Sequence, residues 1–161
     1  MEIEALQLGD EDTVQQIWSL QHAAYPYEAQ AIGLSDLPPL RDTYASIAAC
    51  GEIFYGIRDP EGDLIGAVAV ELEQEKLTIS RMMVAPDHFR EGIATRLVTH
   101  VLSTYKEVPL LIVFTGSKNF PAVRLYEKAG FQPVGTLEVV PAVELTEFHL
   151  HRSGEGMADK A

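Results

Sequence analysis

Apolar and polar residues alternate at the start of the chain and then change to a longer period. The alternation from Ile3 to Leu8 is typical of a half-buried strand, and residues 9–12 supply turn and helix-cap chemistry. Five residues then follow at helical spacing: Val14, Ile17, Trp18, Gln21 and Tyr25. We expect Pro26 to end this helix, because proline disfavours helix in the residue before it. Residues 26–39 show no clear period, which indicates a loop or a short helix beside a cleft.

Shorter segments follow in the remainder of the chain. A helix is expected over Arg41–Cys50, ended by Gly51, and a hairpin turn over residues 59–63. The predicted strands are Ile53–Ile57, Leu64–Leu72, Lys76–Val84, Leu110–Phe114, Phe131–Leu137 and Val143–His151. The predicted helices are Gly92–Tyr105 and Phe120–Lys128, and Gly130 ends the second.

The order of these elements combines antiparallel hairpins with one strand-helix-strand crossover near residues 77–114. The 161 residues, 47% of them hydrophobic, suit one domain with one sizeable core. We predict a mixed α/β (α+β) fold over residues 1–152, with a central mixed, mostly antiparallel sheet and helices on both faces. Residues 153–161 are expected to be a disordered tail.

Charge and composition narrow the classes of partner. The 24 acidic and 12 basic side chains give a net charge of −12, which repels phosphate backbones and attracts cations, so nucleic acid is not an expected partner. Many acidic surfaces serve solubility alone. No apolar run approaches the roughly 20 residues of a membrane span, and the first residues lack signal-peptide character, so we expect a cytoplasmic protein without a membrane partner. A lone Cys50 fits a reducing compartment and is expected to be a small buried residue.

The stretch from Leu77 to Leu102 carries the most specific chemistry: a strand, a short loop and a helix that opens at Gly92. Such a helix start directs unpaired N–H groups and the positive end of its dipole toward an anion. Gly92 and Ala94 leave room for close approach of a pyrophosphate. The expected donors are the backbone N–H groups of Arg90, Glu91, Gly92, Ile93, Ala94 and Thr95, with the Arg90 guanidinium adding charge. An ordinary amphipathic helix with a glycine near its start would look similar.

This stretch resembles motif A of the GNAT superfamily of N-acetyltransferases, an apolar strand and a proline followed by Q/R-x-x-G-x-G/A. Here Phe89 occupies the Q/R position and Arg90 follows it. The resemblance implies acetyl-CoA as co-substrate. It also implies that the cofactor's amide arm pairs with the backbone edge of Met82, Met83 and Val84, as an added strand would.

A second segment, 119–131, is similar to the GNAT pattern N-x-x-A-x-x-L-Y-x-x-x-G-F. The matching residues are Asn119, Ala122, Leu125, Tyr126, Gly130 and Phe131. The resemblance implies that Asn119 holds the pantetheine arm and that Tyr126 is the general acid toward the departing thiolate. A phenol with a pKa near 10 can give its proton to a thiolate of comparable basicity. Asn119 could equally cap the following helix, and Tyr126 could be an ordinary core residue.

The expected reaction is direct attack of an amine on the acetyl thioester. The positions where relatives often carry a glutamate base hold Thr78 and Phe114, which cannot act as bases. We assign no base. The candidate carboxylates are Glu28, Asp36, Glu71, Glu73, Glu144 and Glu147. The acceptor is expected between residues 25–40 and 139–147, and its candidate contacts are Tyr25, Tyr27, Glu28 and Asp36.

Several alternatives remain open from the sequence. A non-catalytic acyl-CoA-binding sensor or interaction module would keep the fold without turnover. A phosphoryl transferase is disfavoured, because the loop at 89–95 lacks the lysine and Ser/Thr of a P-loop. His149 and His151 share a strand face without a third ligand, so no metal is expected. The acceptor is expected to be a small-molecule or peptide amine of unassigned identity, and the protein could be a homodimer.

Overall fold

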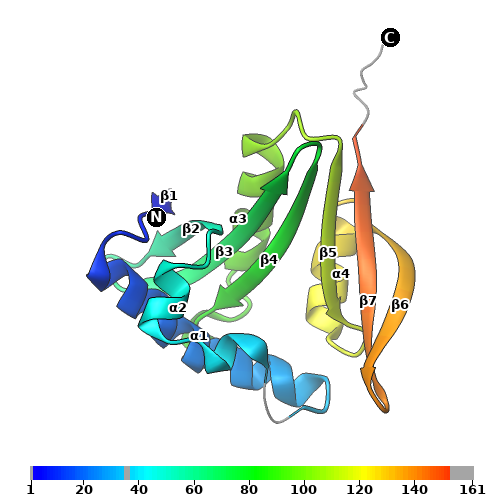
Figure 1. The fold of residues 1–161 in the computed structure, drawn as a ribbon, viewed down its shortest axis with the longest axis horizontal. Coiled ribbons are helices and arrows are strands. Elements are labelled where there is room, and N and C mark those ends of the chain that lie inside the picture. Colours follow the sequence, from blue (N-terminus) through cyan, green and yellow to red (C-terminus); the bar gives the residue numbers. More distant parts are fainter. Residues whose placement is uncertain (1, 35–36, 153–161) are drawn as a thin grey trace.

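Seven strands form one sheet in the computed structural model, which describes residues 2–34 and 37–152 (Figure 1). The strands are β1 (Ile3–Leu6), β2 (Ile53–Arg58), β3 (Leu64–Glu73), β4 (Lys76–Val84), β5 (Leu110–Gly116), β6 (Gln132–Val140) and β7 (Val143–His151). Their order is β1-β2-β3-β4-β5-β7-β6, and every neighbouring pair is antiparallel except the central pair β4 and β5. This arrangement confirms the predicted mixed, mostly antiparallel sheet.

Helices cover both faces of the sheet, as predicted (Figure 1). On one face, α1 (Glu11–Ala31) and α2 (Tyr44–Ala48) form the first hydrophobic cluster with residues of β3 and with Met83 of β4. On the other face, α3 (Ile93–Thr104) and α4 (Phe120–Lys128) form the second cluster with the remaining alternate residues. Two short 3₁₀ helices, Pro38–Arg41 and Pro86–His88, lie in the connections.

The two central strands separate halfway along their length. The β4–β5 register runs only from Lys76↔Leu110 to Ile79↔Val113. A bulge follows at once in β4, because Ile79 pairs with Val70 and Arg81 with Ala69, which leaves Ser80 as an extra residue. The strands diverge beyond this level, and Figure 1 shows the widening between them. The sheet therefore has an opening between the ends of β4 and β5.

Helix α1 continues through Pro26, so the predicted end of the helix at that residue is wrong. A proline inside a helix removes a backbone hydrogen bond and is unfavourable by about 3 kcal/mol. Beyond it, however, Ala29 and Ile32 are buried at 2% and 5% exposure in the first cluster. Burial of this last turn and a half outweighs the local preference, and six residues expected to be irregular are helical.

Other boundaries differ from the prediction in smaller ways. Of the expected helix at 41–50, only α2 (Tyr44–Ala48) is α-helical, after a capping box of Thr43 and Ser46, and Arg41 ends the preceding 3₁₀ turn. Strand β6 extends to Val140, three residues beyond its predicted end. Asp36 and the expected tail 153–161 lie outside the described residues. Of the helices in the described ranges, none is long and apolar enough to cross a bilayer.

Candidate active site

The start of α3 presents unpaired backbone donors to open space. Gly92 is the N-cap at φ +78°, a left-handed conformation that glycine adopts without a steric penalty, and no side chain caps this end. A Cβ built on Gly92 would meet no atom within 4 Å. The first N–H groups of a helix have no intrahelical acceptor. The start of α3 is therefore open to an anion.

The loop before α3 adds further donors. Its backbone bonds run from His88 to Ala85 (2.8 Å) and from Phe89 to Pro86 (3.2 Å), and the next bond along the chain is from Arg96 to Gly92 (3.0 Å). The N–H groups in between are those that the sequence predicted as pyrophosphate donors. Arg90 has φ +67° and is exposed to solvent, so the role of its guanidinium stays a prediction.

Tyr126 is fixed by the way α4 ends. The Gly130 N–H donates to the Glu127 carbonyl and the Phe131 N–H to the Tyr126 carbonyl, both at 3.0 Å, and Gly130 has φ +104°. This is a Schellman motif, in which the residue after the glycine packs on the residue five positions before it. The rings of Tyr126 and Phe131 accordingly lie 5.6 Å apart. The spacing L-Y-x-x-x-G-F thus holds one buried phenol, 3% exposed, in a set orientation.

Asn119 is the N-cap of α4. Its side-chain oxygen accepts from the Ala122 N–H at 3.4 Å, and proline follows within the first turn. The structure thus shows the capping role, and within residues 2–34 and 37–152 the Asn119 amide nitrogen has no hydrogen-bond acceptor. A contact to the pantetheine arm stays a prediction.

Helix α1 brings Tyr25 onto the edge of β4 exposed by the opening. The Met82 N–H donates to the Tyr25 hydroxyl at 3.3 Å, and the Tyr25 side chain is buried at 5% exposure. Burial and the nearby charge of Glu28 raise the pKa of Tyr25, so the phenol stays protonated. The backbone edge predicted to bind the cofactor arm therefore already donates one hydrogen bond to a phenol of α1.

Glu28 lies close to both phenols. Burial raises its pKa to about 7, and its negative charge in turn raises the pKa of Tyr126, after the larger effect of burial on that ring. The same charge acts on Tyr25. A carboxylate and a phenol from opposite layers, with a second phenol from α1, thus converge near the opening between β4 and β5.

The remaining predicted residues lie elsewhere. The Tyr27 ring contacts Phe89 of the loop before α3, edge to face at 5.6 Å, and is 55% exposed. Glu147 is paired with His149 at 2.6 Å. Glu71, Glu73 and Glu144 are exposed to solvent. Of the predicted acceptor contacts within the described residues, Tyr25 and Glu28 come together with Tyr126, and Tyr27 does not.

A buried ionic cluster beside the site was not predicted from the sequence. Arg81 contacts Asp42 (2.8 Å) and Glu52 (2.9 Å), and its Nη1 also donates to Gln21 at 2.6 Å. The bulge at Ser80 turns both Ser80 and Arg81 toward Glu52. In a regular strand Ser80 and Arg81 would point to opposite faces, and the bulge allows both to reach Glu52. A bulge has no clear signature in a single sequence. The cluster ties α1 and the segment before β2 to the residue preceding Met82.

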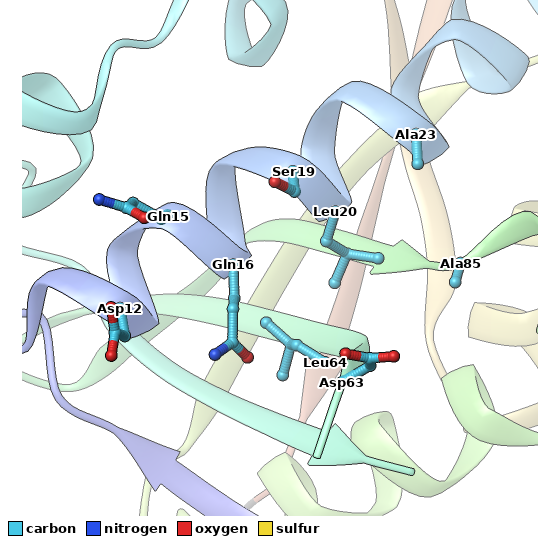
Figure 2. A pocket seen from close by; sticks show the side chains of 9 residues that line it. All are labelled: Asp12, Gln15, Gln16, Ser19, Leu20, Ala23, Asp63, Leu64 and Ala85. Carbon is cyan, nitrogen blue, oxygen red and sulfur yellow. The ribbon is translucent and has the colours of Figure 1, made fainter. Parts of the chain in front are cut away.

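A separate hollow lies along the opposite side of α1. Figure 2 shows α1 side chains on one side of it and the start of β3 on the other. It is lined by Asp12, Gln15, Gln16, Ser19, Leu20, Ala23, Asp63, Leu64 and Ala85. Neither Tyr126 nor Glu28 lines it, and only Ala85 belongs to the motif region. The predicted site residues Tyr126 and Glu28 are therefore not part of this hollow.

The fold and the two motifs correspond to one protein family. Residues 14–131 match the family described as Acetyltransferase (GNAT) family, and the chain belongs to that family. The chain is 36% identical over 149 residues to the UPF0157 protein YqkA of Bacillus subtilis (strain 168). That match covers 92% of this chain and 43% of YqkA, so the chain spans less than half of that relative's length.

Two solved structures show the same fold. The ribosomal-protein-S18-alanine N-acetyltransferase from Escherichia coli superposes with a TM-score of 0.76 at 15% identity, over 98% of this chain and 99% of that one. A chimera of spermidine N-acetyltransferase from Vibrio cholerae gives 0.71 at 19% identity, over 96% and 98%. At these identities the likeness concerns the fold alone.

Proposed function

We propose that the protein transfers an acetyl group from acetyl-CoA to a primary amine by direct attack, with Tyr126 as the general acid. The observation that carries this proposal is the position of the Tyr126 phenol. The end of α4 holds the Tyr126 ring on one face of the sheet. The phenol also interacts electrostatically with Glu28 and Tyr25 of α1, at the opening between β4 and β5. Family membership supports acetyl transfer to amines in general.

The residues present suit acetyl-CoA. The uncapped start of α3 would receive the pyrophosphate, because Gly92 leaves the space in front of it open and the helix dipole favours negative charge. The exposed edge of Met82, Met83 and Val84 would receive the amide arm. At Met82 the cofactor would share the N–H with Tyr25, whose own O–H would remain available as a donor.

The chemistry follows from these positions. The amine nitrogen attacks the thioester carbonyl carbon, and the charge that develops on the carbonyl oxygen would be stabilised by the Met82 N–H or the Tyr25 hydroxyl. As the carbon–sulfur bond breaks, the thiolate takes the Tyr126 proton. The structural neighbours named for a protein alanine and for spermidine both act on amines, which supports an amine acceptor without selecting one.

The test is the variant Tyr126→Phe, which keeps the ring and removes the proton donor. We expect kcat for thiol release to fall about 100-fold or more, while the calorimetric Kd for acetyl-CoA changes less than about threefold. Tyr44→Phe is the matched control, because Tyr44 is 47% exposed on α2 and packs edge to face on Trp18, away from the opening. It should leave both quantities unchanged.

The two readouts separate the alternatives. An unchanged kcat in Tyr126→Phe would contradict the acid role. Saturable acetyl-CoA binding by the wild-type protein without thiol release for any amine would instead favour a non-catalytic acyl-CoA-binding protein. No binding of acetyl-CoA would remove the proposal altogether.

A further inference from the structure

One face of α1 crosses the sheet from β4 to β5. Gln21 accepts from Arg81 at 2.6 Å, and Tyr25 accepts from Met82 at 3.3 Å, so this part of the face lies over β4. At the other end, Ile32 lies over β5, because a Cβ built on Gly116 would be 2.1 Å from the Ile32 Cγ2. The spacing 21, 25, 28, 32 follows one helix face.

Glu28 occupies the middle of that face. It is the member between Tyr25, which lies over Met82, and Ile32, which lies over Gly116. Both strand positions lie three residues beyond the last β4–β5 pair, Ile79↔Val113. Glu28 therefore lies over the opening itself, at the level where β4 and β5 are no longer paired. Figure 1 shows α1 passing this end of the two strands.

Tyr126 approaches the same opening from the other layer. It belongs to the second hydrophobic cluster, under α3 and α4, whereas Tyr25 belongs to the first. The Glu28 charge nevertheless acts on both phenols, and Tyr126 also acts on Tyr25. Since the sheet separates the layers elsewhere, these three groups meet through the opening.

Glu28 differs from Asp42, Glu52 and Glu147 in having its negative charge unopposed. Asp42 and Glu52 are bonded to Arg81, and Glu147 to His149. For half-buried Glu28, burial is the one effect on the pKa, and no cation or hydrogen-bond donor among the described residues counteracts it. A cation brought by a substrate would supply the missing partner.

We propose that Glu28 accepts the proton of the attacking amine, and that the acceptor is therefore a primary amine that is protonated in free solution. This inference rests on the proposed function. It supplies from α1 the base that Thr78 and Phe114 on the strands cannot provide. The ammonium group would first pair with the Glu28 carboxylate over the opening, and proton transfer would then leave a neutral nucleophile next to the thioester.

The proton balance is complete with these groups. The ammonium gives one proton to Glu28, and the neutral nitrogen forms its bond to the carbonyl carbon. The carbon–sulfur bond breaks with transfer of the Tyr126 proton to the thiolate sulfur. The second amine proton returns to the Tyr126 oxygen, and Glu28 releases its proton to water. The products are the acetamide, the CoA thiol and one proton.

The two proton transfers assist each other. While Glu28 is ionised, its charge raises the pKa of Tyr126 and keeps the phenol protonated. Protonation of Glu28 by the ammonium removes that charge and so makes Tyr126 a stronger acid. Tyr126 thus becomes a better proton donor when the amine becomes a nucleophile. The titratable groups on which the Glu28 charge acts are Tyr25 on α1 and Tyr126 on α4, and Arg81 on β4 acts on Tyr25.

A titration by NMR tests the carboxylate without any turnover. The Glu28 side-chain carboxyl carbon, assigned by comparison with Glu28→Gln, is expected to titrate with a midpoint near 7. Adding propylammonium to the CoA-bound protein should lower that midpoint, because a cation favours the ionised form. A midpoint at the ordinary glutamate value of about 4.3 would overturn the proposal. A midpoint unmoved by propylammonium would do the same.

Kinetics with two amines test the catalytic role. One probe is lysine methylamide with its α-amine acetylated (side-chain pKa about 10.4), and the other is an alanine tripeptide amide with a free α-amine (pKa about 8). Glu28→Gln should lower kcat/KM for the lysine probe about 100-fold or more at pH 7. The loss should be smaller for the tripeptide, because a larger fraction of its amine is already neutral. Glu127→Gln, an exposed charge beside Tyr126, is the control and should match wild type.

The outcomes distinguish the role of Glu28 from the proposed acetyl transfer. Equal losses for both probes would show that Glu28 positions the amine without accepting its proton, and an unchanged rate in Glu28→Gln would show no role. Either result overturns the inference and leaves acetyl transfer intact. If the wild-type protein releases no thiol with either probe or with spermidine, the proposed function itself is overturned.

Discussion

At the scale of single residues, the site contains a carboxylate whose burial is unfavourable for folding. Glu28 is half-buried, and its pKa in the folded protein is about 7, compared with about 4.3 in an unfolded chain. The folded state therefore binds more protons than the unfolded state between these values, and stability falls as the pH rises through them. Below about pH 4 Glu28 is protonated in both states and the penalty is absent.

Because ionised Glu28 destabilises the folded state, Glu28→Gln should be more stable than wild type at high pH, although we expect it to lose activity. Glu28→Gln should unfold at higher urea concentration than wild type at pH 8, by about 1 to 2 kcal/mol in the free energy of unfolding. The figure is below the full linkage value of about 1.4 kcal/mol per pKa unit because the side chain is only half-buried. At pH 4.5 the two proteins should be nearly equal. A difference independent of pH would contradict the assigned pKa.

At the scale of elements, the start of α3 combines a strained backbone position with open space. Gly92 has φ +78°, where other residues are unfavourable by about 1 to 2 kcal/mol, and its missing Cβ faces no protein atom. Gly62, in the turn between β2 and β3, shares both properties at φ +92°. The two glycines differ in that only one lies at the uncapped helix start.

The two glycines provide a matched test of the proposed pyrophosphate site at the start of α3. Gly92→Ala and Gly62→Ala should lose similar stability, about 1 kcal/mol, measured by urea unfolding. Only Gly92→Ala should weaken acetyl-CoA binding, by about tenfold in calorimetric Kd, because its methyl group would occupy the space of the pyrophosphate. Equal binding by both variants would place the cofactor elsewhere.

At the scale of the whole molecule, one buried cluster holds the first layer against the centre of the sheet. Arg81 joins β4 to Asp42 before α2, to Glu52 before β2 and to Gln21 on α1. Burial would raise the pKa of Glu52, but the hydrogen bonds and charge of Arg81, with Ser80, outweigh burial and lower it. The Asp42 pKa is also lowered, because Ser46, Arg81 and Gln21 outweigh its burial.

Loss of Arg81 should leave these carboxylates without their cation. Arg81→Met is expected to lower the free energy of unfolding at pH 7 by about 3 to 5 kcal/mol. Because both folded pKa values lie below their unfolded values, the stabilisation is complete above about pH 4.5 and is lost as the pH falls through the folded values. The difference from wild type should therefore shrink in acid. Arg58→Met, which breaks the more exposed pair with Glu4, should change stability by less than about 1 kcal/mol.

Local sequence patterns determined most of the elements and both motifs of this protein. The strands and helices from Ile53 onward follow apolar periods, and the Gly130 stop predicts the end of α4. The open start of α3 follows from Gly92 alone. These features depend on residues within one or two turns of each other, so a single sequence contains enough information to predict them.

Tertiary structure decided the rest. The continuation of α1 past Pro26 depends on burial of Ala29 and Ile32 against distant residues. The contacts Gln21–Arg81 and Tyr25–Met82 join positions 60 and 57 residues apart, and the bulge at Ser80 directs both of these β4 residues. In the sequence Glu28 was therefore one of six candidate carboxylates, and no local pattern set it apart from the other five. Its surroundings are set by where two strands part and which helix crosses the opening, because packing between layers fixes them and no local pattern does.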